Sequence, residues 1–324
     1  MRTRKLGFTE LNLTTVGLGT WAIGGSGWEF SWGPQNDEEA IAAIMTGLEQ
    51  GVNWIDTAAI YGLGHSEELV GKALKQTSRK PFVATKCGLL GDPHGHIVHC
   101  LKAKSIRAEC EASLKRLGVE TIDLYQIHWP DPDEDIEQGW DAMAKLTRDG
   151  LVRYIGVSNF DVEQIQRAQK IHPVASLQPP YSMIHREVEN GVLGYCAKNN
   201  IGVVVYSPMQ RGLLTGKFTH ERMAVLSADD HRRRSPDFHE PHFSATIELV
   251  EKLKPIARRH GRTPAQLAIS WVLRRSEVTA AIVGARRPSQ IEETAPAADW
   301  VLDTDEINQI EQLLDERLEK IGAK

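Results

Sequence analysis

Residues 53–76 read NWIDTAAIYGLGHSEELVGKALKQ, and this stretch contains the repeating unit that decides the fold. Residues 53–56 form a short apolar run that is typical of a buried strand. Further along, Ser66 is followed by Glu67 and Glu68, and acidic side chains are favourable at the positive end of a helix. The stretch therefore predicts a β-strand followed by an α-helix.

The same alternation runs through the rest of the chain. Helices are indicated by apolar stripes and by local signals: Asn36 before an acidic turn, Gly118 after a stripe, and Thr263 with Pro264 and Gln266. The strand-like runs are residues 15–20, 53–56, 82–85, 122–127, 152–157, 174–177, 202–205 and 279–283. Strands that are each followed by a helix predict parallel pairing with right-handed crossovers.

Two α/β architectures share this alternation, the open doubly wound sheet and the closed (β/α)8 TIM barrel. An open dinucleotide-binding sheet would carry Gly-x-Gly-x-x-Gly after its first strand. Here Gly17 and Gly19 are followed by Trp21 and Ala22, which depart from that motif. The pattern therefore favours the barrel.

We expect residues 1–324 to form a single barrel domain, because no linker or internal repeat divides the chain. Residues 2–13 precede the first barrel strand and predict an N-terminal hairpin across the barrel bottom. Residues 304–320 predict an extra amphipathic C-terminal helix. Residues 208–243 form a connection rich in charge and histidine, and so long a loop is usually functional.

The composition narrows the class of partner. Hydrophobic residues make up 41% of the chain, charged residues 25%, and the net charge is −5, which argues against a general nucleic-acid binder. The four cysteines form no Cys-x-x-Cys pair, which favours a reducing compartment. The first residues are basic but lack the apolar stretch of a signal peptide, so we expect none, and no apolar run reaches the ~18 residues of a membrane span. We expect a cytoplasmic protein with a small-molecule partner, no nucleic acid and no membrane.

Polar side chains close several of the predicted strands. In a (β/α)8 barrel the working residues lie at the C-terminal ends of the strands and in the loops that follow. Asp56, Lys86 and His128 occupy such positions, and Tyr61 follows Asp56 on the same rim. Ser158, Asn159, Gln178, Tyr206 and Ser207 close three further strands. A lone Asp or His at a strand end is more often a satisfied turn residue, so the residues alone leave a structural interpretation open.

The first four residues form a chemically sensible set. Tyrosine ionises near pH ~10 and is a poor acid at neutral pH unless its pKa falls. A neighbouring Lys86 ammonium would stabilise the phenolate, and Asp56 would keep that lysine charged. His128 could hydrogen-bond a carbonyl oxygen. Together they would polarise a carbonyl group and protonate the alkoxide that forms.

The strings around these residues resemble the aldo-keto reductase family, in particular a bacterial branch near the potassium-channel β subunits and general stress reductases. The resemblance extends from about residue 3 to about residue 293. It rests on GVNWIDTA (51–58), YGLGHSE (61–67), ATK (84–86), DLYQIHWP (123–130), GVSNF (156–160), YSP (206–208) and RGLLTGK (211–217).

The resemblance implies a barrel that reduces aldehydes or ketones to alcohols by hydride transfer from NADPH, which becomes NADP+. It assigns Tyr61 as general acid, Lys86 and Asp56 as the groups that tune it, and His128 as the group that orients the substrate, a small and possibly sugar-like carbonyl compound. The expected substrate wall comprises Trp21, Trp28, Tyr61 and Trp129. Trp21, Trp28, Phe30 and Trp32 follow the first strand, and all four fit either an apolar substrate wall or a structural role in a buried loop.

The resemblance also implies a cofactor site across the barrel top. Ser158, Asn159 and Gln178 would hold the carboxamide, Tyr206 would stack on the nicotinamide, and residues 208–243 would cover the pyrophosphate. Arg286 would favour NADP over NAD by binding the 2′-phosphate, whereas Thr294 stands where many relatives carry Asn. The full expected set is Thr20, Trp21, Asp56, Ser158, Asn159, Gln178, Tyr206, Ser207, Pro208, Met209, Gly212, Leu213, Lys217, Gly284, Arg286, Gln290 and Glu293.

Two other functions compete with a reductase. A nucleotide-sensing regulatory subunit of the same fold would bind the cofactor but turn over slowly. A metal-dependent hydrolase would need ligands, and the cluster of Cys87, His94, His96, His99 and Cys100 has no standard zinc spacing. We therefore expect no metal and interpret residues 87–100 as a substrate-facing loop. The arginine run 232–234 could contact a phosphate group, but we interpret it as a solvated surface segment.

Overall fold

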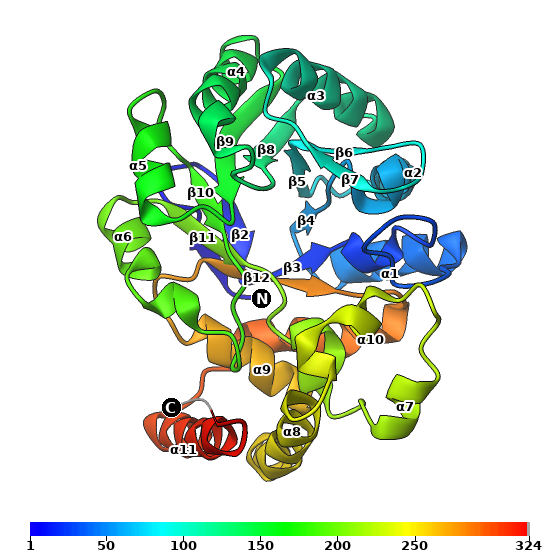
Figure 1. Cartoon of the computed structure of the whole chain (residues 1–324), viewed down its shortest axis with the longest axis vertical. Helices are drawn as coiled ribbons and strands as arrows, with labels where there is room; N and C mark the ends of the chain where they lie inside the picture. The colour runs from blue at the N-terminus through cyan, green and yellow to red at the C-terminus, as the bar shows by residue number, and fades with distance from the viewer. Residues whose placement is uncertain (323–324) are drawn as a thin grey trace.

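A closed barrel of parallel strands forms the centre of the molecule (Figure 1). The computed structural model describes residues 1–322. Around the barrel the strands follow the order β10-β11-β12-β3-β4-β5-β8-β9 and close on themselves. Their bounds are β3 (Val16–Gly19), β4 (Trp54–Asp56), β5 (Phe82–Cys87), β8 (Ile122–Ile127), β9 (Val152–Ser158), β10 (Ser176–Gln178), β11 (Gly202–Val205) and β12 (Ala280–Gly284). The prediction of a (β/α)8 barrel is confirmed, and each predicted strand lies within about two residues of an observed one.

Helices surround the barrel and bury their apolar faces against it (Figure 1). The Asn36 side chain caps the first helix, and Thr263 and Gln266 form the predicted capping box of another. Gly118 ends a third helix with φ of 68°, a left-handed conformation that glycine adopts without strain. The helices that follow the strands in turn are α1 (Asp37–Glu49), α2 (His65–Gln76), α3 (Ala103–Leu117), α4 (Ile136–Arg148), α5 (Val162–Gln169), α6 (Val192–Lys198), α9 (Pro264–Leu273) and α10 (Pro288–Thr294).

An N-terminal hairpin closes the bottom of the barrel, as predicted. Its strands β1 (Thr3–Lys5) and β2 (Asn12–Thr14) pair antiparallel. Leu6, Leu11 and Leu13 are at most 2% exposed and pack in one cluster with Trp54 from the start of β4. Each buried leucine contributes about 1.5–3 kcal/mol relative to an exposed one. The hairpin therefore seals the barrel at the end opposite to the expected site.

Two long helices extend beyond the barrel repeat. The predicted C-terminal helix is α11 (Thr304–Lys320), and it packs against α8 (His242–Arg259), which the sequence analysis did not anticipate (Figure 1). Residues 208–243, expected to be a loop, contain α7 (His220–Ala224) and several short 3-10 helices. A cluster of Leu213, Phe218, Phe238 and Phe243 gives this connection a hydrophobic core of its own.

Three excursions leave the C-terminal ends of the strands and surround the same mouth. They are residues 20–36 after β3, the hairpin of β6 (Leu89–Gly91) and β7 (Ile97–His99) after β5, and residues 208–243 after β11. Backbone contacts join the first and third, since His231 N donates to Ser31 O. Among residues 1–322, no helix combines the length and the apolar character needed to span a membrane.

Candidate active site

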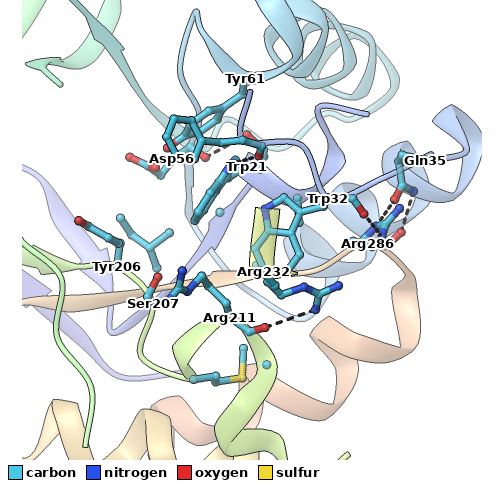
Figure 2. A pocket seen from close by; sticks show the side chains of 18 of the residues that line it. Trp21, Trp32, Gln35, Asp56, Tyr61, Tyr206, Ser207, Arg211, Arg232 and Arg286 are labelled. Atoms are coloured by element: carbon cyan, nitrogen blue, oxygen red, sulfur yellow. Dashed lines mark hydrogen bonds between the residues drawn. The ribbon is translucent and has the colours of Figure 1, made fainter. Parts of the chain in front are cut away.

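A cavity of about 880 Å³ opens at the C-terminal ends of the barrel strands (Figure 2). Residues from the ends of the strands and from all three excursions line it. Its size falls within the range typical of small-molecule and cofactor sites. The barrel therefore places the predicted strand-end residues around one shared space, as its topology requires.

Lys86 is the centre of a buried polar group at the base of this cavity. The residue is 1% exposed, and Nζ donates to Asp56 Oδ1 at 2.7 Å and to the Thr57 carbonyl at 2.8 Å. Nζ also lies within hydrogen-bond distance of the Tyr61 hydroxyl, at 3.2 Å. The ring of His128 meets the Tyr61 ring edge to face, with centroids 5.7 Å apart. The structure thus brings together all four residues that the sequence predicted.

The protonation of Tyr61 differs from the sequence-based expectation. Burial raises the pKa of Tyr61 well above its usual value of 10, and the nearby Asp56 charge raises this pKa further. The net direction is opposite to the lowering expected from Lys86, because burial and the Asp56 charge outweigh the ammonium that lies 3.2 Å from the hydroxyl. Burial and the Lys86 charge hold the pKa of His128 well below 6.5. At neutral pH, Tyr61 keeps its proton and His128 is uncharged.

A second hydrogen-bond network extends from this group along the cavity wall. Gln178 Nε2 donates to Asp56 Oδ2 at 2.9 Å, and the backbone carbonyl of Gln178 accepts from Ser158 Oγ at 2.8 Å. Asn159 Nδ2 donates to the His128 carbonyl at 2.9 Å and Asn159 Oδ1 accepts from Tyr206 OH at 2.9 Å. Asn159 has φ of 63°, which asparagine tolerates better than most residues. Amides and hydroxyls of the predicted cofactor set therefore lie beside the Asp56–Lys86 pair.

Cationic side chains gather along another part of the cavity wall. Lys217, Arg222, Arg232, Arg286 and Arg287 all line it. The Arg286 guanidinium is anchored by residues 32–35: Nε donates to Gln35 Oε1 at 2.6 Å, and two further nitrogens donate to the carbonyls of Trp32 and Pro34 (Figure 2). Such a group of cations suits a phosphate-bearing ligand.

Arg232 is not part of a solvated run, which corrects the sequence-based interpretation. It is 6% exposed, its Nε donates to Asp230 Oδ1 at 2.9 Å, and its guanidinium carbon lies 4.6 Å from the centroid of the Trp32 ring (Figure 2). The neighbouring Arg233 and Arg234 are exposed, as expected. The sequence did contain a sign that Arg232 is buried, namely Asp230 two residues earlier. An arginine is rarely buried unless it is paired, and Asp230 is such a partner.

Most of the predicted residues line the cavity, and two do not. Leu213 packs in the core of the 208–243 connection, so its side chain does not reach the site. Lys86 is enclosed behind Tyr61 and Asp56 and acts on the cavity through them. The predicted residues that line the cavity are Thr20, Trp21, Trp28, Asp56, Tyr61, His128, Trp129, Ser158, Asn159, Gln178, Tyr206, Ser207, Pro208, Met209, Gly212, Lys217, Gly284, Arg286, Gln290 and Glu293.

Several lining residues were missed by the sequence analysis. Gln35 holds Arg286, and Arg211 follows the Tyr206–Met209 wall in a left-handed turn with φ of 54°. Trp32, which the sequence analysis placed either in the substrate wall or in a buried loop, lines the cavity, and its buried Nε1 donor has no partner in the part of the chain that the structure describes. Within residues 1–322, no group of three or more His, Cys, Asp or Glu side chains could hold a metal ion.

Three comparisons relate this chain to known proteins. The model of the Aldo/keto reductase family matches residues 15–315. Aldo-keto reductase YhdN from Bacillus subtilis is 39% identical over 310 residues, which cover 95% of this chain and 92% of that protein. The NADH-specific methylglyoxal reductase of Escherichia coli is 34% identical over 311 residues, covering 92% and 93%. The structure of the glycerol dehydrogenase AKR11B4 from Gluconobacter oxydans has a TM-score of 0.87 and 37% identity, covering 99% of this chain and 96% of that one.

Proposed function

Because this chain belongs to the aldo/keto reductase family, we propose that it is an NADPH-dependent reductase that converts aldehydes or ketones to alcohols, with Tyr61 as the proton donor. One observation supports this proposal above all others. A buried lysine hydrogen-bonds both an aspartate and a protonated tyrosine at the base of a cavity, and an uncharged histidine lies beside that tyrosine. These are the groups that carbonyl reduction needs beside a hydride source.

Each residue of this group has a distinct part in the proposed reaction. NADPH, when bound, supplies the hydride that forms the new C–H bond at the carbonyl carbon. His128 donates a hydrogen bond to the carbonyl oxygen and fixes its orientation. Tyr61 gives its proton to the same oxygen, so that the alcohol leaves uncharged. Lys86 then stabilises the Tyr61 phenolate across the 3.2 Å contact, while Asp56 keeps Lys86 charged.

The donor groups of the cavity fit a nicotinamide dinucleotide. Ser158, Asn159 and Gln178 would hold the carboxamide, and the Tyr206 ring would lie against the nicotinamide. Gln178 now donates to Asp56, and Asn159 accepts from Tyr206, so these groups are already oriented by one another. The unpartnered Trp32 Nε1 is a donor that remains for a ligand in the described structure.

The cations at the wall support NADPH as the preferred form of the coenzyme. Arg286 is held by Gln35 and lies close enough to Arg232 and Arg287 for their charges to lower its pKa, after burial as the main cause. Such a site gains most from the dianionic 2′-phosphate that distinguishes NADPH from NADH. The E. coli relative is named as NADH-specific, so this preference requires measurement.

Coenzyme binding and turnover should be measured separately. Binding of NADPH is followed by fluorescence titration, and NADPH oxidation is followed at saturating coenzyme with a panel of aldehydes and ketones. Oxidation that depends on both the carbonyl compound and Tyr61 is the expected result. Tight binding without carbonyl-dependent oxidation would instead support the nucleotide-sensing alternative.

A further inference from the structure

A glutamine lies inside the barrel, where bulky apolar side chains are the rule. Gln126 belongs to β8 and is 0% exposed. Its neighbours Tyr125 and Ile127 pack in the cluster formed with the surrounding helices, whereas Leu124 packs in the interior cluster that contains Trp54. Because successive side chains of a strand point to opposite faces, Gln126 points into the barrel, as Leu124 does. Packing of the interior alone gives no reason for an amide at this position.

Gln126 ends a chain of hydrogen bonds whose direction is fixed by charge. The Asp56 carboxylate accepts from Lys86 Nζ at 2.7 Å through Oδ1, and an ionised carboxylate can only accept at its other oxygen as well. Gln178 Nε2 donates to this second oxygen, Oδ2, at 2.9 Å and also donates to Gln126 Oε1 at 3.3 Å. Both amide hydrogens of Gln178 are therefore used within the protein.

The side-chain oxygen of Gln178 is the polar atom that remains for a ligand. Among residues 1–322, no group donates a hydrogen bond to Gln178 Oε1, and Gln178 lines the cavity. An amide held by one hydrogen bond can still turn about its last side-chain bond, because this torsion is broad in glutamine. The second bond, to Gln126, restricts this rotation and so fixes the direction in which Gln178 Oε1 points.

The Gln126 amide is itself unfavourable for folding. Its Nε2 is buried and has no hydrogen-bond partner in the described part of the chain. A buried donor without a partner lowers stability, and a leucine of similar size would avoid this loss. The amide is therefore explained by its other atom, Oε1, and by what this oxygen does for Gln178.

We infer that Gln126 is a positioning residue for the coenzyme: it fixes the plane of the Gln178 amide so that Gln178 Oε1 meets the carboxamide N–H of the nicotinamide. The inference rests on the proposed function, which assigns this carboxamide to Gln178, and adds the residue that orients the acceptor. An acceptor that is already oriented loses less conformational freedom when the coenzyme binds, and this strengthens binding.

Two coenzymes that differ only at the carboxamide test the inference. NADP+ carries the carboxamide, whereas its 3-acetylpyridine analogue carries a methyl ketone in the same place and has no N–H to donate. Their dissociation constants can be measured by quenching of tryptophan fluorescence. We expect the wild-type protein to bind NADP+ about fivefold more tightly than the analogue. In Gln126→Leu this preference should fall to about twofold or less, because NADP+ binds more weakly while the affinity for the analogue is nearly unchanged.

Ser176→Ala is the matched control. Ser176 lies on β10 two residues before Gln178, is 0% exposed, and has a buried Oγ without a partner in the described chain. The substitution removes an interior polar atom but keeps the bond between Gln126 and Gln178, so the preference for NADP+ should stay at the wild-type value. Denaturant unfolding should show both variants to be at least as stable as wild type, which separates weaker NADP+ binding from damage to the fold. Gln126→Met, whose unbranched side chain also lacks the acceptor, repeats the test should the leucine variant not fold.

The outcomes separate this inference from the proposed function. A preference that is unchanged in the Gln126 variants, or lost equally in Ser176→Ala, would overturn the inference, as would equal weakening of both coenzymes or a wild-type protein that binds them equally. The expected preferences without carbonyl-dependent oxidation of NADPH would support the inference and contradict the reductase. A wild-type protein that binds neither coenzyme would overturn both.

Discussion

At the scale of the residue, the environment of Tyr61 keeps it protonated although the Lys86 ammonium lies 3.2 Å from its hydroxyl. Burial and the Asp56 carboxylate both disfavour the phenolate. Lys86 donates to Asp56, so its charge is balanced before any reaction begins. The proposed acid therefore stays protonated across neutral pH, and Lys86 becomes important when the proton leaves and negative charge appears on the tyrosine oxygen.

The first prediction concerns a variant that lacks the proposed proton donor, the Tyr61 hydroxyl. Tyr61→Phe deletes the hydroxyl and keeps the ring in its cluster with Trp28, so the fold and the cofactor end of the cavity are preserved. We expect kcat for carbonyl reduction to fall by more than about tenfold, which corresponds to about 1.4 kcal/mol of transition-state stabilisation. The dissociation constant of NADPH, from fluorescence titration, should remain nearly unchanged. A variant that keeps more than about a tenth of the wild-type kcat would exclude Tyr61 as the proton donor.

Arg286 gives the second prediction at this scale. Arg286→Ala removes the guanidinium proposed to bind the 2′-phosphate, so the dissociation constant of NADPH should rise by about tenfold or more while that of NADH changes little. Both constants can be measured by fluorescence titration. Gln35→Ala is the matched control, because it breaks the same Arg286–Gln35 hydrogen bond but keeps the cation. Equal weakening of NADPH and NADH would reject the role of Arg286 as a 2′-phosphate ligand.

At the scale of the element, one carboxylate binds two residues of a left-handed turn in the connection between β11 and α8. Gln210 and Arg211 have φ of 45° and 54°, a left-handed conformation that costs side-chain-bearing residues about 1–3 kcal/mol each. Asp237 Oδ2 accepts from both, from Gln210 Nε2 at 2.7 Å and from Arg211 Nη2 at 2.6 Å. Burial alone would raise the pKa of Asp237, but hydrogen bonds from His185 and Gln210 and the Arg211 charge hold it at about 2. The carboxylate is therefore charged at every ordinary pH.

The third prediction concerns this clamp, the hydrogen bonds from Gln210 and Arg211 to Asp237. Asp237→Ala releases both residues of the strained turn, whose neighbours Ser207 to Met209 line the cavity. We expect the dissociation constant of NADPH to rise by about tenfold, or about 1.4 kcal/mol, with a smaller change in kcat at saturating coenzyme. His185→Ala is the control, since it removes a third partner of Asp237 at 2.9 Å but leaves the turn bonded. Unchanged coenzyme affinity in Asp237→Ala would show that the turn keeps its shape without the clamp.

Elements also explain which parts of the site were predictable. Asp56, Lys86 and His128 could be placed together from sequence, because parallel strands of a barrel end on one rim and each residue closes or follows a recognisable strand. Contacts between the long connections at the barrel mouth could not be predicted in this way, because their packing has no repeating pattern in the sequence. Gln35 and Arg286 are 251 positions apart in the chain, and Arg232 meets Trp32 only because two connections pack across the mouth. The direction of the Tyr61 pKa was missed for a related reason, since burial is a property of the assembled barrel.

At the scale of the whole molecule, the buried side chain of Glu109 joins a surrounding helix to the barrel by a hydrogen bond. Glu109 of α3 is 7% exposed; its Oε2 accepts from the Gly88 N–H after β5 at 2.9 Å, and its Oε1 accepts from Ser105 Oγ at 2.9 Å. Burial raises the pKa of Glu109 from 4.5 to about 7. The proton on this side chain is therefore coupled to the folding of the molecule.

The fourth prediction concerns how stability changes with pH. Below pH 4.5 the folded and unfolded chains both hold the Glu109 proton. As pH rises from there to about 7, the unfolded chain releases the proton while the folded chain keeps it, so the free energy of unfolding falls by up to about 3 kcal/mol.

Glu109→Gln should not show this fall in the free energy of unfolding, because glutamine does not titrate. Denaturant unfolding should therefore show the variant gaining stability relative to wild type between about pH 5 and pH 8. Glu111→Gln, an exposed position on the same helix, should follow the wild-type slope. If the stability difference between Glu109→Gln and wild type were the same at both pH values, Glu109 would not couple protonation to folding.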